Sequence, residues 1–250
     1  MIRPLIAGNW KMFKTVQESL DFVTQIKKEL PLSLDRDVLV APPFPSLYPV
    51  SEILKDSPIR LGAQNLHDAK EGAFTGEVSA PMLLAAGCDS VIIGHSERRT
   101  LFGETDAIIN KKIRAACESG LKPIFCIGET LAERESGQTF SVLERQIKQG
   151  LNSFNVSDIR HLVVAYEPVW AIGTGKTATP DQAQEAHAFI RSTIDGVFGA
   201  EFASEHAILY GGSVNPENIS SLMSRPDING ALVGGASLKV DSFLRIILYP

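Results

Sequence analysis

Eight short apolar runs recur along the chain, and they constrain its fold more than any other feature of the sequence. Most of them are continuous instead of alternating with polar residues, which is typical of parallel strands whose two faces are both buried. The runs lie at residues 5–7, 38–41, 59–62, 90–93, 123–127, 162–165, 207–210 and 231–233.

The segments between these runs predict helices. Residues 143–151 carry apolar side chains at fourfold spacing, and residues 183–197 form a second apolar face, as expected of helices packed on a sheet. Paired polar residues and a favourable proline mark where helices begin. Three helix starts are predicted on these grounds. The first has Thr130 paired with Glu133, the second has Thr179 paired with Gln182 and followed directly by Pro180, and the third has Asn215 followed by Pro216.

Eight alternating strand and helix units imply right-handed β-α-β connections and an α/β fold. A chain of 250 residues fits either a closed (β/α)8 barrel or an open doubly wound sheet. No linker or low-complexity tract divides the sequence, so a single domain over residues 1–250 is expected.

Composition limits the classes of partner and compartment. The net charge of −5 argues against broad nucleic-acid binding, which normally goes with a basic excess. Cys88, Cys117 and Cys126 are odd in number and lack metal-ligand spacing, so a reducing compartment is expected. The first residues have no signal-peptide pattern, and no run approaches the roughly 20 apolar residues of a membrane helix. The expectation is a cytoplasmic protein without membrane contact.

Polar residues and glycine turns follow the apolar runs where each strand should end. In a barrel these carboxyl ends share one face, on which the active site is built. Residues distant in sequence are therefore expected to converge there. They are Asn9, Lys11, His95, Glu97, Cys126, Glu129, Glu167, Gly211–Ser213 and Gly234–Gly235.

Glu167 and His95 are the candidate acid–base residues. Glu167 ends an apolar run, and poor hydration should raise the pKa of its carboxyl, making it a base near neutral pH. The alternative is a carboxylate in an ordinary salt bridge. His95 precedes a predicted helix start, whose N–H groups disfavour an imidazolium, yet a neutral ring can still donate to an oxyanion. A purely structural histidine is the alternative. His95 and Glu97 have the spacing of zinc deaminases, but no Pro-Cys-x-x-Cys follows, so no metal site is predicted.

Two further residues have competing interpretations. An isolated lysine such as Lys11 is ordinarily a surface residue, but here the apolar run at 5–7 leads directly into it. Cys126 is expected to be a small apolar core residue, since a nucleophile would need an exposed, electropositive setting.

The glycine-rich stretch before Lys176 resembles a nucleotide-phosphate loop only in part. That motif needs a glycine at position 170, where this chain has Trp170. Three glycine turns could still present N–H groups to an anion, and the two after the last strands lie where barrels bind phosphate. They are Gly173–Gly175, Gly211–Ser213 and Gly234–Gly235.

Seven motifs occur in order along the chain: AGNWKM, GAFTGE, IIGHSERR, CIGE, AYEPVWAIGTGKTAT, YGGSVN and LVGGASL. With them the whole chain resembles the triosephosphate isomerase family. The resemblance implies a closed, cofactor-free (β/α)8 barrel, the TIM barrel. It also implies interconversion of dihydroxyacetone phosphate and D-glyceraldehyde 3-phosphate in glycolysis and gluconeogenesis.

The resemblance further implies residue roles. Glu167 would move the proton between carbons, His95 would act as electrophile, and Asn9 and Lys11 would polarise the carbonyl, with Glu97 organising Lys11. The family is usually a homodimer in which Thr75 reaches the partner's site. Phe13 replaces a common asparagine, without consequence for catalysis. The amides of Gly173, Ser213, Gly234 and Gly235 would hold the phosphate, and residues 171–175 would form the tip of a lid.

Two other functions remain open at this point. One is an aldolase that forms a Schiff base at Lys11. The other is a non-catalytic phosphate-binding barrel, which the fold alone permits.

Overall fold

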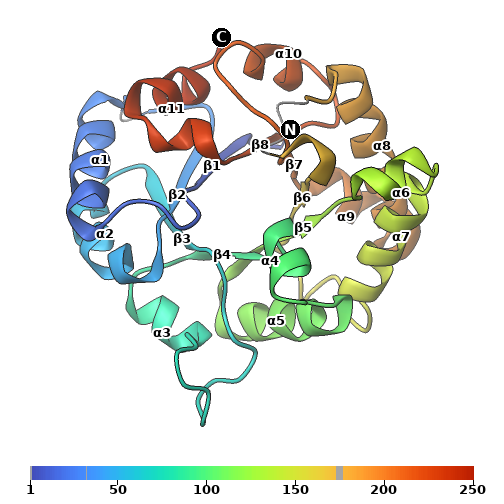
Figure 1. Cartoon of the computed structure of the whole chain (residues 1–250), viewed down its shortest axis with the longest axis horizontal. Helices are drawn as coiled ribbons and strands as arrows, with labels where there is room; N and C mark the ends of the chain where they lie inside the picture. Colours follow the sequence, from blue (N-terminus) through green and yellow to red (C-terminus); the bar gives the residue numbers. More distant parts are fainter. Residues whose placement is uncertain (1, 32, 173–176) are drawn as a thin grey trace.

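The computed structural model describes residues 2–31, 33–172 and 177–250. Its centre is a closed barrel of eight parallel strands in sequence order, ringed by helices (Figure 1). The pairing of the first strand with the eighth, from Leu5↔Gly230 to Gly8↔Val233, closes the barrel and excludes the open sheet. The strands are β1 (Leu5–Asn9), β2 (Asp37–Ala41), β3 (Ile59–Ala63), β4 (Ser90–Ile93), β5 (Lys122–Ile127), β6 (Val163–Tyr166), β7 (Ile208–Tyr210) and β8 (Gly230–Val233).

The helices lie outside the barrel, between successive strands. Longer ones cover the strands and shorter ones shape the loops. They are α1 (Val16–Glu29), α2 (Leu47–Leu54), α3 (Ala80–Ala85), α4 (Ser96–Leu101), α5 (Asp106–Ser119), α6 (Leu131–Glu135), α7 (Thr139–Gly150), α8 (Pro180–Phe198), α9 (Ala200–Glu205), α10 (Ile219–Met223) and α11 (Val240–Ile247), with 3-10 turns η1 (Phe44–Ser46), η2 (Val169–Ala171) and η3 (Gly235–Leu238).

The strands are apolar throughout because each contributes to two cores. In β1, Leu5 and Ala7 point into the barrel, whereas Ile6 packs against the surrounding helices. Cys126 lies fully buried in the inner core, as predicted for a structural cysteine. Burial raises the pKa of the Cys126 thiol well above its ordinary value, which keeps it protonated and unreactive.

Two of the three predicted helix starts are confirmed. The Thr130 and Thr179 side chains accept the N–H groups of Glu133 and Gln182 in complete capping boxes, and Pro180 is the first residue of α8. Such a cap contributes about 1 kcal/mol. The third start is wrong in position.

The helix after β7 begins at Ile219, three residues beyond Pro216. The Asn215 side chain accepts the N–H groups of Glu217 and Asn218, so residues 215–218 form a turn before the helix. None of the described helices combines the length and the apolar composition that crossing a membrane requires.

Candidate active site

A hollow of about 380 Å³ opens at the carboxyl ends of the strands, where the sequence placed the active site. Asn9 and Lys11 follow β1, His95 follows β4 and Glu167 follows β6. The two glycine turns after β7 and β8 complete the wall. The predicted residues that line it are Asn9, Lys11, His95, Glu167, Gly211, Gly212, Ser213, Gly234 and Gly235; Gly173 lies outside the described residues.

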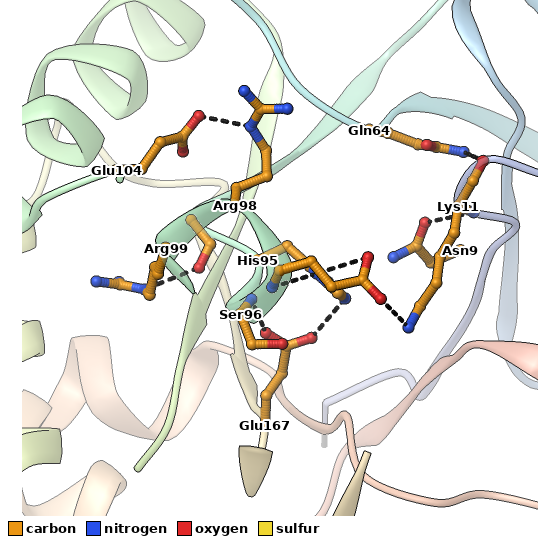
Figure 2. Close-up of polar contacts among 11 residues, drawn as sticks. Asn9, Lys11, Gln64, His95, Ser96, Arg98, Arg99, Glu104 and Glu167 are labelled. Carbon is orange, nitrogen blue, oxygen red and sulfur yellow. Dashed lines mark hydrogen bonds and ion pairs between the residues drawn. The ribbon is translucent and has the colours of Figure 1, made fainter. Parts of the chain in front are cut away.

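Glu167 is only 2% exposed, and both carboxylate oxygens have a partner (Figure 2). Oε1 lies 2.9 Å from His95 Nε2, and Oε2 accepts the Ser96 N–H at 2.8 Å. Burial raises the pKa of Glu167, but His95, the Ser96 N–H and Lys11 outweigh it, so the pKa falls below its ordinary value. The expected rise is therefore wrong for this arrangement, because two donors stabilise the anion.

His95 occupies the N-cap position of α4. Its Nδ1 accepts the Glu97 N–H at 3.2 Å, leaving Nε2 as the nitrogen that carries the proton towards Glu167. Burial lowers the pKa of His95, but the Glu167 charge and hydrogen bond, with Glu97, raise it above its usual value. A proton on Nδ1 would face the Glu97 N–H, so this backbone contact favours the neutral Nε2–H form.

Contacts with three residues hold Lys11 in place. Its φ of 53° is in the left-handed region that few non-glycine residues adopt, and its N–H donates to Asn9 Oδ1 at 3.1 Å. Gln64, after β3, donates to the Lys11 carbonyl at 2.8 Å. Nζ lies 2.6 Å from Glu97 Oε1, so Glu97 touches the site through Lys11, outside the hollow's lining.

Two glycines, Gly128 and Gly211, leave the space that Glu167 occupies. A Cβ at Gly211 would lie 2.8 Å from Glu167 Cγ, and a Cβ at Gly128 would overlap the Glu167 carbonyl oxygen. Real Cβ atoms do not come this close to other atoms, so a side chain at Gly128 would collide with backbone and one at Gly211 would force the Glu167 side chain to shift. The glycine after β7 that the sequence suggested as an anion turn thus also accommodates the glutamate chain.

The phosphate-binding candidates lie together on the wall opposite β4. The Asn218 side chain donates to the Ser213 carbonyl at 2.9 Å, which orders the turn after β7. A Cβ at Gly234 would lie 3.5 Å from Lys11 Cε, so the turn after β8 approaches the lysine closely. Backbone N–H groups in such turns are suited to oxyanions.

Sequence reasoning missed the residues that support this constellation. Ser96 donates its backbone N–H to Glu167, and the Gln64 side-chain amide donates to the Lys11 carbonyl and braces that residue. Glu129 was recognised only as a strand-end residue, yet it is fully buried and accepts from Tyr166, Trp170 and Arg134. Its position two residues after an apolar strand was the available signal.

Comparison with known proteins places this site in a family. The triosephosphate isomerase family model matches residues 4–249. Triosephosphate isomerase of Carboxydothermus hydrogenoformans is 58% identical over 247 residues, which cover 99% of this chain and 98% of the relative. The enzymes of Syntrophotalea carbinolica and Moorella thermoacetica are 54% and 55% identical, with 100% of this chain and 99% of each relative covered.

Proposed function

The chain belongs to the triosephosphate isomerase family and interconverts dihydroxyacetone phosphate and D-glyceraldehyde 3-phosphate, and we propose that Glu167, His95 and Lys11 carry out that reaction. The observation that supports the assignment is the contact of a buried carboxylate with an N-capping histidine at the head of the hollow. The reaction is a step of glycolysis and gluconeogenesis, as in the family.

Glu167 acts as the base. Its carboxylate takes a proton from the carbon beside the carbonyl, the carbon's electron pair forms the C=C bond, and the carbonyl oxygen becomes an oxyanion. Glu167 then returns the proton to the neighbouring carbon. Because Ser96 and His95 now occupy its oxygens, the carboxylate leaves them to reach carbon, which restores the effect of burial and raises its basicity.

His95 and Lys11 stabilise the oxyanion. When Glu167 turns to the substrate, the main cause that raises the pKa of His95 is removed, and burial and the Glu97 N–H on Nδ1 favour the neutral ring. A neutral Nε2–H donor can bind the oxyanion and pass a proton between the two oxygens. The Lys11 ammonium adds positive charge, oriented by Glu97, while Asn9 fixes the lysine backbone.

The glycine turns hold the phosphate. The Ser213, Gly234 and Gly235 amides would donate to its oxygens, with Gly173 contributing from the segment outside the described residues. Ala171 and Ile172, the last described residues before that segment, already line the hollow. Closure of the 171–175 lid over the phosphate would exclude water and retain the enediolate.

A coupled assay tests the activity directly. Added dihydroxyacetone phosphate should yield glyceraldehyde 3-phosphate, detected by its oxidation with a dehydrogenase and NAD. A non-catalytic phosphate-binding barrel would give no product. An aldolase acting through Lys11 would be trapped on its substrate by borohydride. The ion pair with Glu97 at 2.6 Å opposes that chemistry, because a paired ammonium has no lone pair to attack a carbonyl.

We also propose that the protein is a homodimer. The segment from 64 to 79 projects from the barrel after β3 (Figure 1), and Thr75 near its tip is exposed. Large apolar side chains are exposed on this segment, after β1, in α2 and after α4, a feature of interaction surfaces. They are Met12 at 93%, Phe13 at 55%, Tyr48 at 60%, Phe74 at 46% and Phe102 at 66% exposure.

A groove beside Lys11 could receive the projecting loop of a second copy. Its volume is about 370 Å³, and Met12, Phe44, Gln64, Glu97 and Phe102 are among its lining residues. The partner's Thr75 would then complete the surroundings of Lys11. Light scattering after gel filtration should give twice the 27.1 kDa chain mass, and a monomer would contradict the proposal. We place the protein in the cytoplasm, an assignment supported by its three unpaired cysteines.

A further inference from the structure

The barrel has a second hollow at its opposite end. It measures about 390 Å³ and lies where the strands begin, with Arg60 from β3, Lys122 from β5 and His161 just before β6 in its wall. The inner core of the barrel, including Leu39, Ile92 and Ile124, separates it from the catalytic hollow. It is therefore a different site from the one described above.

Positive charge exceeds the carboxylates available to balance it. Asp37 pairs with Arg3 at 2.6 Å and with Arg60 at 3.6 Å, while Asp89 pairs with Arg60 at 2.8 Å and with Lys122 at 3.3 Å. Two carboxylates thus serve three cations, although the whole chain carries a charge of −5.

Arg160 adds a fourth cation to the same wall. Within the described part of the chain its side chain makes one hydrogen bond, to the Ser157 carbonyl at 3.3 Å, and no ion pair. Glu205 lies in the wall as well and supplies one negative charge. The wall therefore retains an excess of hydrogen-bond donors facing the hollow.

The surroundings of the His161 ring are electrostatically positive. Burial, followed by Lys122, Arg160, His206 and Arg60, lowers the pKa of His161, and no carboxylate acts on it in the opposite direction. Its neighbour His206 has Nδ1 at 2.7 Å from the Phe202 carbonyl and Nε2 at 3.1 Å from the Arg160 carbonyl.

We propose that this amino-terminal hollow binds a polyphosphate chain through Lys122, Arg160 and His161. Guanidinium and ammonium groups form their strongest hydrogen bonds with such oxyanions, and the hollow has room for several linked phosphates. The chain could come from an inorganic polyphosphate or from a nucleoside triphosphate, which share this chemistry.

Calorimetry with tripolyphosphate tests the proposal. Glycerol 3-phosphate at saturating concentration keeps the catalytic hollow occupied, so heat reports the second site. NMR of the His161 ring should show a shift on titration with the same probe. Adenosine triphosphate in a parallel titration distinguishes the sources: tighter binding than tripolyphosphate indicates a nucleotide, and equal or weaker binding indicates the inorganic chain.

The double variant Arg160→Ala/His161→Ala should weaken binding by about tenfold or more, because charge-assisted contacts are lost. Both residues are exposed, so unfolding is not expected, and isomerase kcat and KM should stay within about twofold of the parent. His161→Ala alone provides a second, milder variant. Lys111→Ala removes an exposed charge from α5, away from either hollow, and should bind as the parent does.

Several results would overturn the proposal. They are the absence of heat and of a His161 shift with either probe, competition of the probe with glycerol 3-phosphate, and unchanged affinity in the double variant. Because the readout is binding at the far end of the barrel, failure here leaves the isomerase assignment intact, and an inactive protein could still bind the probe.

Discussion

Glu129 and Glu167 are both almost completely buried, at 0% and 2% exposure, and follow adjacent paired strands. Glu129 points away from the catalytic hollow and accepts from the Tyr166 hydroxyl, the Trp170 indole and Arg134. Glu167 points into the hollow and is held by one ring and one backbone N–H. Burial alone therefore does not distinguish the carboxylate that we propose as the base; its access to the hollow does.

The largest expected effect comes from shortening each of these two glutamates to aspartate and comparing the loss of kcat. Glu167→Asp withdraws the base from the reacting carbon, and a misplacement of about 1 Å can lower kcat a hundredfold. Steady-state kinetics with unchanged circular dichroism would measure it. Glu129→Asp is the matched control and should retain kcat within about tenfold, which corresponds to a change of about 1.4 kcal/mol in the activation free energy of the reaction. Near-normal turnover of Glu167→Asp would remove Glu167 from the chemistry.

The space around Glu167 gives the next effect. In Gly211→Ala the new Cβ would lie 2.8 Å from Glu167 Cγ, and such overpacking costs about 1–3 kcal/mol. We expect kcat to fall roughly tenfold, since about 1.4 kcal/mol corresponds to that factor.

Gly235→Ala is the matched control for this substitution. No atom lies within 4 Å of its added Cβ, and the backbone N–H is retained. Both variants should be compared for kcat and KM in the same assay. Equal losses in the two variants would show that Gly211 is not there to accommodate Glu167.

The role of Glu129 predicts a smaller effect, mainly on stability. Glu129→Gln removes the charge that pairs with Arg134 and places an amide beside the Trp170 indole N–H. Mismatched donors in a buried site cost about 1–3 kcal/mol, so the free energy of unfolding in urea should fall by about 2 kcal/mol. Because Trp170 lies in the turn η2, next to the proposed lid and not among the proposed catalytic residues, we expect kcat to change only a few fold.

Glu144→Gln is the corresponding surface control. It breaks an exposed ion pair with Lys148, and such pairs contribute less than about 1 kcal/mol. If Glu129→Gln were no more destabilising than Glu144→Gln, Glu129 would not be a structural anchor for the lid base.

Local patterns in the sequence predicted buried parallel strands alternating with helices, and the resemblance to the family selected the closed barrel over the open sheet. Buried parallel strands require continuous apolar runs, and strand ends in a barrel meet on one face, so Asn9, His95 and Glu167 could be placed together. Ser96 and Gln64 could not be identified in this way. Their contributions are a backbone N–H and an amide brace, which depend on three-dimensional position and leave no characteristic residue pattern.

The predicted rise in the pKa of Glu167 was wrong for the same reason. Burial can be inferred from an apolar strand, and alone it raises a carboxyl pKa. The Ser96 N–H and the His95 ring reverse the sign, and both contacts arise only when β4 and β6 are brought to the same end of the barrel.

The smallest expected effect is a pH dependence that separates Glu167 from an inert buried carboxyl. The folded protein lowers the pKa of Glu167, whereas the unfolded chain has the ordinary value of about 4.3. Between the two values the unfolded chain binds more protons, so the free energy of unfolding rises as the pH rises and falls as the solution is acidified. The stabilisation is complete above about pH 4.3 and is lost as the pH falls through the folded value.

Glu167→Gln has no such proton to bind, so it isolates this contribution. Urea unfolding of both proteins at several pH values from about pH 5 to about pH 3, below the ordinary titration range of a histidine near 6.5, should show the parent losing stability relative to the variant as the pH falls. Parallel curves over the whole range would mean that His95 and Ser96 do not stabilise the Glu167 carboxylate. A parent that gained relative stability on acidification would show instead that burial controls this carboxyl, and that the two buried glutamates differ less than their partners imply.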